Sequence, residues 1–427
     1  MKGWALRGTV ALALAGLGAP PASSAMAPLA PASSAPPTFA QVDAAVRRGI
    51  TRGVYPGAVV VVGRSDRILY AAAYGRTTWS RRAPHPTVRG SLWDVASLTK
   101  VVGTASAAAR LVDRDSLELD APVARYLPRF GGEVGGDKGR VTVRMLLDHT
   151  SGLPPFLPLY RMAKSRDAAL DLVYAEPLRR TPGDSALYSD LNAILLGLVL
   201  EQVTALPLDT IVAREVTRPL GMRDTRFRLP ARLAARAVPS GIFHGRELRG
   251  EVNDLNAAAM GGVAGHAGLF STGADLARFA QTWLRLGRPP RSKRQWVDST
   301  TLRRFLTGSP GSGARLLGWD TRDTTRTEPS VFGSLLSAEA YGHTGWTGTE
   351  LWIDPARDLF LVFLTNRSFD PRTKQNSFEE LRDVRAAVSD AAVRAADRLC
   401  AASRAQAKRP KAKRPKAKPS TGAPPRC

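Results

Sequence analysis

The chain has 427 residues, and its 61 Lys and Arg against 37 Asp and Glu give a formal net charge of +24 at neutral pH. This length suffices for a large buried core and usually for two lobes. The only two cysteines, Cys400 and Cys427, fall at or beyond the end of the last expected helix, which excludes a disulfide framework; the sequence leaves open whether they are bridged or free.

The first 25 residues have the pattern of a secretory signal peptide. Lys2 and Arg7 precede an apolar stretch of about ten residues, and small residues follow up to Ala25. A bilayer span needs ~20 apolar residues, so we expect cleavage after residues 1–25 and no transmembrane span. Residues 26–37 then form an Ala/Pro/Ser-rich lead-in, and the protein is expected to be secreted or periplasmic.

The folded part is expected between residues 38 and 400. Residues 39–53 are amphipathic and stop at a glycine, which predicts a helix. Residues 56–75 contain two apolar runs joined by a polar turn at residues 64–66, which predicts an antiparallel hairpin. Helical spacing then recurs at 94–113, 141–148, 167–175, 189–204, 208–217 and 273–286.

The stretch DVASLTK (94–100) opens the first of these helical segments. Ser97 and Lys100 are three positions apart, so on a helix their side chains share one face. The chain uses 50 Arg but only 11 Lys, and a Lys, unlike an Arg, can lose its proton. Apolar neighbours predict burial, so we expect a lowered Lys100 pKa that allows the amine to accept the Ser97 proton. A single Ser-x-x-Lys is as frequent as chance predicts, so the pair needs support from elsewhere.

A second candidate element is PGDSALYSDLNAILLG (182–197). Tyr188 and Asp190 stand where an apolar helix begins. Near a cationic Lys the pKa of a phenol falls, and the phenolate can act as a base. Simple packing at a helix entrance is the commoner fate of such a Tyr, and this alternative stays open.

Residues 341–367 predict a second hairpin with its turn at 354–357, and residues 377–400 predict a final helix. The first strand of this hairpin carries GHTGWTG (342–348), and glycines in a strand often mark close approach by a ligand. His343 and Thr344 offer polar groups there. A twisted or bulged strand with a chance His is the alternative.

Strand patterns at both ends and helical patterns between them predict an α+β fold. We expect an antiparallel sheet built from the N- and C-terminal segments and flanked by the terminal helices, with a mostly α-helical lobe inserted at about residues 100–300. A cleft is expected between the two lobes, and Ser97 lies at their boundary.

The C-terminal residues 401–427 lack large apolar and aromatic side chains and contain a repeated Ala-Lys-Arg-Pro-Lys. Such a tail is expected to be disordered. Contact with polyanions and a merely solvated basic tail remain two open interpretations. Without interleaved aromatics, specific nucleic-acid recognition is not expected.

Other hydrolase and nucleotide-binding signatures are absent from the sequence. It has no Gly-x-Ser-x-Gly, no His-Glu-x-x-His among its five histidines and no phosphate-binding Gly-x-x-x-x-Gly-Lys-[Ser/Thr]. His149 is expected to fix the loop after a helix, and His266 lies in a glycine-rich loop near the expected cleft. We expect no metal and no cofactor.

Taken together and in this order, SLTK (97–100), YSD (188–190) and HTG (343–345) resemble the serine β-lactamase/penicillin-binding protein superfamily, in its class C β-lactamase-like branch of esterases, D-aminopeptidases and DD-peptidases. The similarity spans about residues 40 to 395. Further similar stretches are VTVRMLLDHTSGLP (141–154), PLGMRDTRF (219–227), GGVAGHAGLFSTGADLARF (261–279) and LTNR (364–367).

The resemblance implies roles for these residues. Ser97 would be the acylated nucleophile, Lys100 its base or proton relay, and Tyr188 the group that protonates the leaving group. The backbone N–H groups of Ser97 and Trp346 would form the oxyanion hole. Gly345 would leave room for a substrate along the strand.

Two residues depart from the family pattern. His343 replaces the usual Lys of Lys-Thr-Gly, and Asp190 replaces the Asn of Tyr-x-Asn. In the family that Lys helps to bind a substrate carboxylate, whereas a His with an ordinary pKa is only partly charged. The change disfavours efficient penicillin hydrolysis and favours uncharged esters or amides.

The sequence therefore predicts a serine hydrolase that forms an acyl-enzyme on Ser97 and cleaves a carboxylic ester or a short amide or D-amino-acid peptide. The alternatives are a D-Ala-D-Ala carboxypeptidase, a weak β-lactamase, or a non-catalytic cell-wall peptide-binding protein. Asp190, His343, Thr344 and Gly345 are the predicted substrate-binding residues.

Overall fold

The computed structural model describes residues 37–131, 136–322, 330–370, 372 and 377–407. The predicted signal peptide, most of the lead-in and residues 408–427 of the predicted tail lie outside the described residues. Residues 401–407, predicted to be disordered, instead continue the last helix. Cys400, near the end of the last helix, is disulfide-bonded.

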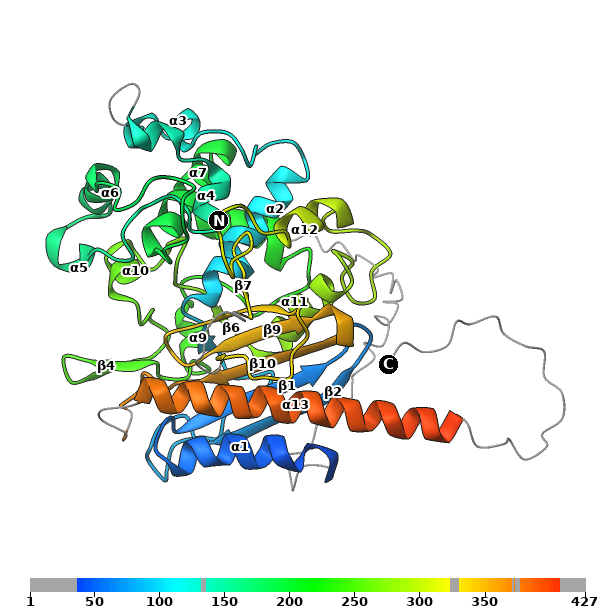
Figure 1. The fold of residues 1–427 in the computed structure, drawn as a ribbon. Helices are drawn as coiled ribbons and strands as arrows, with labels where there is room; N and C mark the ends of the chain where they lie inside the picture. The colour runs from blue at the N-terminus through cyan, green and yellow to red at the C-terminus, as the bar shows by residue number, and fades with distance from the viewer. Residues whose placement is uncertain (1–36, 132–135, 323–329, 371, 373–376, 408–427) are drawn as a thin grey trace, which may run out of the picture. The chain divides into compact units, whose positions relative to one another are not determined.

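The centre of the fold is an antiparallel sheet with strand order β2-β1-β10-β9-β8-β7 (Figure 1). Its strands are β1 (Gly57–Gly63), β2 (Ile68–Gly75), β7 (Asp320–Thr321), β8 (Tyr341–Thr344), β9 (Glu350–Asp354) and β10 (Leu359–Thr365). β1 pairs with β10, with Ala58 opposite Thr365, so the two ends of the chain meet in the middle of the sheet. The predicted α+β fold is confirmed.

Strand β1 shows why the sheet has helices on both faces. Ala58, Val60 and Val62 belong to a core shared with α1 (Ala40–Thr51) and α13 (Ser377–Ala407). Val59 and Val61 point to the opposite face and pack into the core that includes α11 (Gly273–Leu284). Successive side chains of a strand alternate between faces, so an unbroken apolar run requires cover on both. Figure 1 shows α1 and α13 running along one face of the sheet.

Between β2 and β7 the chain is mostly helical, as predicted. The α-helices there are α2 (Ser106–Val112), α3 (Val123–Tyr126), α4 (Val143–Leu147), α5 (Leu159–Met162), α6 (Arg166–Ala175), α7 (Asp190–Thr204), α8 (Leu208–Val212), α9 (Ala231–Ala234), α10 (Leu255–Ala259), α11 (Gly273–Leu284) and α12 (Ser299–Phe305). The π-helical turns are η2 (Lys100–Ala105) and η5 (Ala213–Thr217), and the 3-10 turns of the chain are η1 (Pro37–Phe39), η3 (Pro128–Phe130), η4 (Asp137–Arg140) and η6 (Pro355–Arg357). Two short strand pairs complete the fold: β3 (Trp93–Asp94) with β6 (Phe270–Ser271), and β4 (Gly241–Phe243) with β5 (Arg246–Leu248).

Among the described helices, none is long and apolar enough by itself to cross a bilayer; Asp190–Thr204 and Leu208–Thr217 meet the criterion only as a pair bent by 79°.

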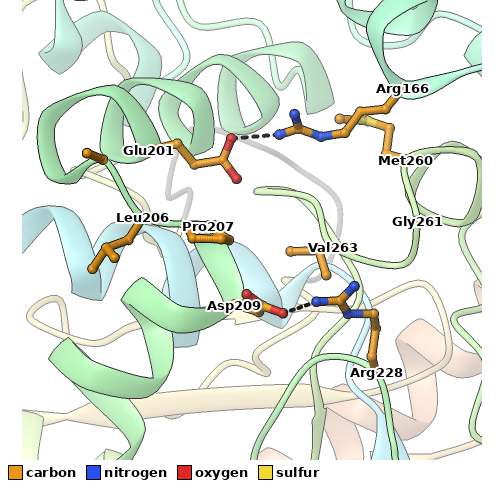
Figure 2. A pocket seen from close by; sticks show the side chains of 10 residues that line it. Arg166, Glu201, Leu206, Pro207, Asp209, Arg228, Met260, Gly261 and Val263 are labelled. Atoms are coloured by element: carbon orange, nitrogen blue, oxygen red, sulfur yellow. Dashed lines mark hydrogen bonds and ion pairs between the residues drawn. The ribbon is translucent and has the colours of Figure 1, made fainter.

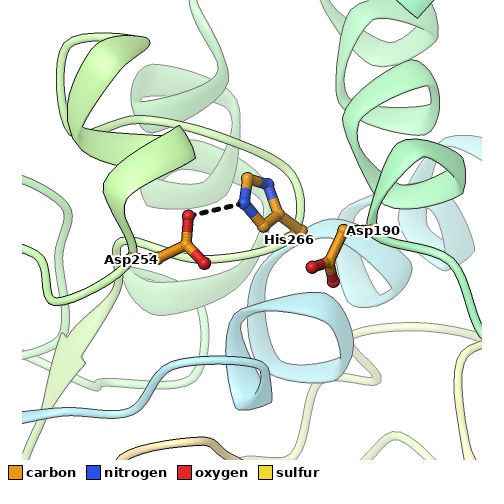
Figure 3. Close-up of side chains that lie close together, drawn as sticks. All are labelled: Asp190, Asp254 and His266. Atoms are coloured by element: carbon orange, nitrogen blue, oxygen red, sulfur yellow. Dashed lines mark hydrogen bonds and ion pairs between the residues drawn. The ribbon is translucent and has the colours of Figure 1, made fainter. Parts of the chain in front are cut away.

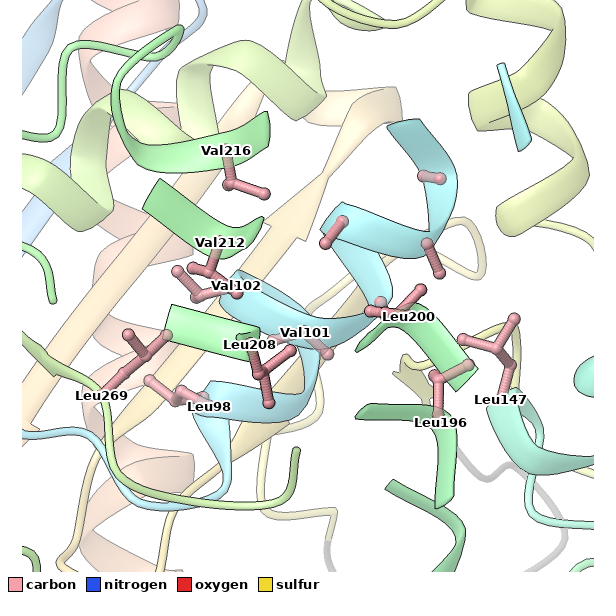
Figure 4. Packing of buried hydrophobic residues seen from close by; sticks show 14 of the residues in the cluster. Leu98, Val101, Val102, Leu147, Leu196, Leu200, Leu208, Val212, Val216 and Leu269 are labelled. Atoms are coloured by element: carbon pink, nitrogen blue, oxygen red, sulfur yellow. The ribbon is translucent and has the colours of Figure 1, made fainter. Parts of the chain in front are cut away.

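The helix predicted over 94–113 begins later than expected. Strand β3 ends at Asp94, and Ala96 has a φ of 48°, in the left-handed region, immediately before Ser97. The helical path starts after this residue and runs as a π-helical turn, a form often found at functional sites. Figure 4 shows Leu98 and Val101 packed among the helices of the lobe, both fully buried.

The predicted C-terminal hairpin is also divided differently. Its turn at 355–357 joins β9 and β10 as expected, but GHTGWTG does not continue as one strand. The Gly345 N–H donates to Thr349 O at 2.8 Å, and the Gly348 N–H donates to Gly345 O at 3.0 Å. The chain therefore turns back here, and β8 pairs with β9, with Thr344 opposite Glu350. Gly348 permits this turn because its φ is 101°.

Candidate active site

Ser97 and Lys100 lie side by side at the start of the π-helical turn. Lys100 Nζ is 2.9 Å from Ser97 Oγ, and its side chain is 4% exposed. The Asp94 carboxylate fixes the segment that leads to Ser97, because one of its oxygens accepts the Ala96 N–H at 2.8 Å and the other accepts the Asn253 N–H at 2.6 Å. The predicted pairing of hydroxyl and amine is present.

The predicted neutral state of Lys100 is wrong. Lys100 Nζ lies 2.7 Å from Asp190 Oδ1 at the first turn of α7. Burial alone would lower the pKa of Lys100, but the Asp190 carboxylate and the Tyr188 phenol outweigh it and raise the pKa above its ordinary value. The resting side chain is an ammonium, and its counter-charge is the Asp that replaces the family's Asn.

Tyr188 lies over this ion pair. Lys100 Nζ is 4.9 Å from the centre of its ring. Burial raises the pKa of Tyr188, although the Lys100 charge acts in the opposite direction. The resting group is therefore a neutral phenol, and the phenolate that the sequence suggested is not the ground state.

Two histidines and an arginine hold the Tyr188 ring. The ring centres of His149 and His343 lie 4.7 and 5.9 Å from that of Tyr188, and the Arg315 guanidinium lies 4.8 Å from it. His149 Nδ1 accepts the Ser189 N–H at 3.2 Å, so it also fixes the start of α7. His149 thus shapes its loop as expected and also packs against the Tyr.

His343 is buried, and its two ring nitrogens have different surroundings. Nδ1 lies 2.7 Å from Thr344 O, an acceptor, so Nδ1 carries the proton in the neutral ring and Nε2 is left as an acceptor. Nε2 has no hydrogen-bond partner in the described part of the chain. Burial lowers the pKa of His343 to about 4, against the pull of Asp320, so at neutral pH the ring is uncharged and not partly charged as expected.

The turn that carries the Trp346 N–H packs against the segment that carries the Ser97 N–H. A Cβ on Gly345 would lie 2.6 Å from Val95 O and 3.3 Å from Ala96 Cβ, so the turn 345–349 packs directly on the segment that leads to Ser97. Within the described ranges, neither the Ser97 nor the Trp346 N–H has a hydrogen-bond partner. Gly345 is therefore needed for contact between these two segments, whatever space a substrate also requires.

Asp254 and His266 form a second pair behind Lys100 that the sequence did not single out as a unit. His266 Nε2 lies 3.0 Å from Asp254 Oδ1, and the Lys100 ammonium donates to His266 O at 3.3 Å. Burial would raise the pKa of Asp254, but the His266 ring and the Ala257 N–H hold it below its usual range. The polar residues before α10 gave no local pattern that predicted this contact.

Asp190, Asp254 and His266 have donor atoms within 4.8 Å of one another, the spacing of a metal site (Figure 3). A cation there would have to displace the Lys100 ammonium from Asp190 and the His266 ring from Asp254. The cluster is therefore better described as a charge network around Lys100.

A cavity of about 440 Å³ lies elsewhere, between α6, α7 and the loop after α10 (Figure 2). Ion pairs between Arg166 and Glu201 and between Arg228 and Asp209 line it. None of the predicted site residues lines this cavity.

Known proteins share the sequence and the fold. The family profile described as Beta-lactamase matches residues 42–385. A protein of Escherichia coli (strain K12), provisionally named D-alanyl-D-alanine carboxypeptidase, is 33% identical over 374 residues, covering 79% of this chain and 85% of its own. An N-acetylmuramyl-L-alanine amidase of Bacillus subtilis (strain 168) is 34% identical, covering 79% and 84%.

Solved structures agree in fold. EstCE1, a hydrolase with promiscuous acyltransferase activity, superposes with a TM-score of 0.65 at 24% identity, covering 82% of this chain and 98% of its own. A penicillin-binding protein homologue from Caulobacter crescentus gives 0.63 at 20% identity, covering 84% and 99%. A class C β-lactamase gives 0.66 at 19% identity, covering 83% and 96%. The chain therefore belongs to the β-lactamase family of serine hydrolases.

Proposed function

We propose that the protein forms an acyl-enzyme on Ser97 and cleaves a carboxylic ester, or a short amide or D-amino-acid peptide. One observation carries the proposal: Lys100 Nζ is 2.9 Å from Ser97 Oγ and 2.7 Å from Asp190 Oδ1. A nucleophilic hydroxyl, a proton relay and an anionic proton acceptor thus lie in one hydrogen-bonded row.

The proton balance follows from this row. As Ser97 Oγ attacks the acyl carbon, its proton passes to the Lys100 nitrogen while Lys100 gives one of its own protons to Asp190. The ammonium is kept, and the charge of Asp190 moves to the acyl oxygen, where the Ser97 and Trp346 N–H groups receive it. The Tyr188 phenol then protonates the leaving group and is reprotonated from the Lys100–Asp190 pair. Water reverses these steps to release the acid.

The environment of His343 supports an ester as the substrate. Relatives with Lys at this position use its charge to hold a carboxylate, whereas neutral His343 presents a buried acceptor. Such a group suits an uncharged substrate or one with an N–H or O–H at this point.

A cell-wall peptide is the second candidate, and Arg315 favours it. Its guanidinium lies against the Tyr188 ring, where it supplies a cation that His343 does not, although Asp320 already pairs with it. The names of the relatives, a carboxypeptidase and a muramyl-alanine amidase, point the same way. Weak β-lactamase activity is third.

Turnover of p-nitrophenyl acetate or butyrate tests the proposal. Ser97→Ala and Lys100→Ala should each lower the rate by at least about 10²-fold. Ser106→Ala is a matched control, because Ser106 is a fully buried serine of the following helix that bonds Val101 O and lies outside the site. Full turnover by Ser97→Ala would refute the assignment.

Covalent labelling distinguishes the proposed hydrolase from a non-catalytic cell-wall binder. A fluorophosphonate or labelled penicillin should add its mass to the wild type and not to Ser97→Ala, as read by intact mass. A wild-type protein that takes neither probe and turns over no ester would favour the binder.

Secretion or a periplasmic location is part of the proposal, and the leader pattern at residues 1–25 supports it. Cell fractionation and the mass of the mature N-terminus would test it. Retention of residues 1–25 on a cytoplasmic protein would contradict it.

A further inference from the structure

Arg385 is a buried cation that the reaction as described does not use. It extends from α13, and only 3% of it is exposed. Its Nη2 donates to Gly345 O at 2.9 Å and to Thr349 O at 2.7 Å. A buried guanidinium is costly unless it is hydrogen-bonded, and the bonds of Arg385 are made to the turn that carries the Trp346 N–H.

The direction of the Trp346 N–H follows from the contact at Gly345 O. No cis peptide bond occurs in the described residues, so the C=O of Gly345 and the N–H of Trp346 point in opposite directions. Because Arg385 and the Gly348 N–H both hold the carbonyl on the α13 side, the amide proton faces away from α13. Gly345 itself packs on Val95 and Ala96, which precede Ser97.

A second arginine, Arg367, holds the carbonyl group of Trp346. Arg367 Nη2 donates to Trp346 O at 2.6 Å, and the Arg367 N–H donates to Thr347 O at 2.8 Å. Its guanidinium also lies 4.7 Å from the Trp346 ring and 4.4 Å from the Phe378 ring. The two carbonyls that flank the Trp346 amide are therefore both held by arginines.

The Glu350 carboxyl lies close enough to Arg385 to affect its pKa. Glu350 on β9 is fully buried, and one of its oxygens lies 3.4 Å from Ser389 Oγ. Burial lowers the pKa of Arg385 to about 10, so it stays charged at neutral pH. A fixed positive charge behind a peptide group also polarises it, which makes the N–H on the far side a better donor to developing negative charge.

We propose that Arg385 is a positioning residue of the oxyanion hole, which aims the Trp346 N–H at the acyl oxygen by holding the Gly345 carbonyl. This inference rests on the proposed acyl-enzyme function. Arg385 itself does not reach the reacting atoms, so its removal should weaken binding of the transition state and leave binding of the ground-state ester unchanged.

Arg385→Met should lower kcat for p-nitrophenyl butyrate by about 10²-fold, the effect of losing one oxyanion donor, with KM within threefold. The affinity for a phenylboronic acid, which forms a tetrahedral adduct on serine, should fall by a similar factor. Arg385→Lys keeps the positive charge but lacks the planar guanidinium that reaches two carbonyls, so its kcat should lie between those of Arg385→Met and the wild type.

Arg64→Met is the matched control. Arg64 is also buried and also donates to a carbonyl, Arg357 O at 3.1 Å, at the far turn of the sheet. Its loss should reduce stability without changing kcat or boronate affinity. If Arg385→Met does not fold, Arg385→Lys decides: a folded Lys variant with wild-type kcat and boronate affinity overturns the proposal.

A folded Arg385→Met that keeps kcat, or that raises KM alone, would also overturn the proposal. Failure of the underlying function gives a different result, because the wild type itself would then lack both turnover and a Ser97 adduct.

Discussion

Gly345→Ala is the sharpest test of the proposal that the Ser97 and Trp346 N–H groups act together as an oxyanion hole. The added Cβ would lie 2.2 Å from Thr349 Oγ1 and 2.6 Å from Val95 O, where ordinary contacts are about 3.5 Å. Thr349 Oγ1 also donates to Val95 O at 3.0 Å, so both neighbours are fixed to each other. The turn and the Ser97 segment must therefore separate by about 1 Å, and such a misplacement costs about 10²-fold in rate.

The assay measures kcat and KM for p-nitrophenyl butyrate together with thermal unfolding. Gly345→Ala should lower kcat by about 10²-fold, change KM little, and lose about 1–3 kcal/mol of stability through overpacking. Gly63→Ala is the control, because its Cβ would lie 2.6 Å from the Phe360 ring and 2.9 Å from Arg67 O, away from the site. It should lose comparable stability and keep its kcat. A folded Gly345→Ala with kcat within threefold of wild type would refute the reasoning.

Three further predictions concern charge. Asp190→Asn removes the carboxylate that raises the pKa of Lys100, so kcat/KM should rise with pH as Lys100 loses one proton. A pH profile of kcat/KM identical to that of the wild type would contradict the proposed proton path. Burial raises the pKa of Glu350 from 4.5 to about 8, so Glu350 stays protonated to a higher pH in the folded state than in the unfolded state. The free energy of unfolding therefore falls as the pH rises from 4.5 to about 8. Glu350→Gln should therefore stabilise the protein by a few kcal/mol more at pH 9 than at pH 4, since each pKa unit corresponds to ~1.4 kcal/mol. Urea unfolding at the two pH values measures this difference, and an equal effect of the substitution at both would contradict the prediction. Deleting residues 408–427 should abolish retention on immobilised polyphosphate at low salt and leave ester turnover unchanged; retention by the shortened chain would show that the tail is not the contact.

The sequence predicted what depends on local spacing. The apolar strand around Val60 and the i, i+3 relation of Ser97 and Lys100 are set by neighbouring residues, and both are present in the structure. The start of α7 at Asp190 follows from the capping Ser189, whose side chain accepts the Leu191 N–H.

The charge state of the site was not predictable in the same way. Burial of Lys100 could be inferred from its apolar neighbours, but its protonation is decided by Asp190, which lies far along the chain and joins it only in the fold. The turn at Gly345 was missed because two glycines are compatible with either a strand or a hairpin, and the choice depends on contacts with Val95 and Arg385.

The contact between the Gly345 turn and the Val95 segment has a consequence for synthesis of the protein. Thr347 Oγ1 donates to Asp94 O and Thr349 Oγ1 to Val95 O, across some 250 positions of sequence. A ribosome therefore makes Ser97, Lys100 and Tyr188 long before the turn that carries Trp346. Until the codons for the last strands have been read, the nascent chain lacks the second N–H of the proposed oxyanion hole, so the complete site is expected only in a nearly finished polypeptide.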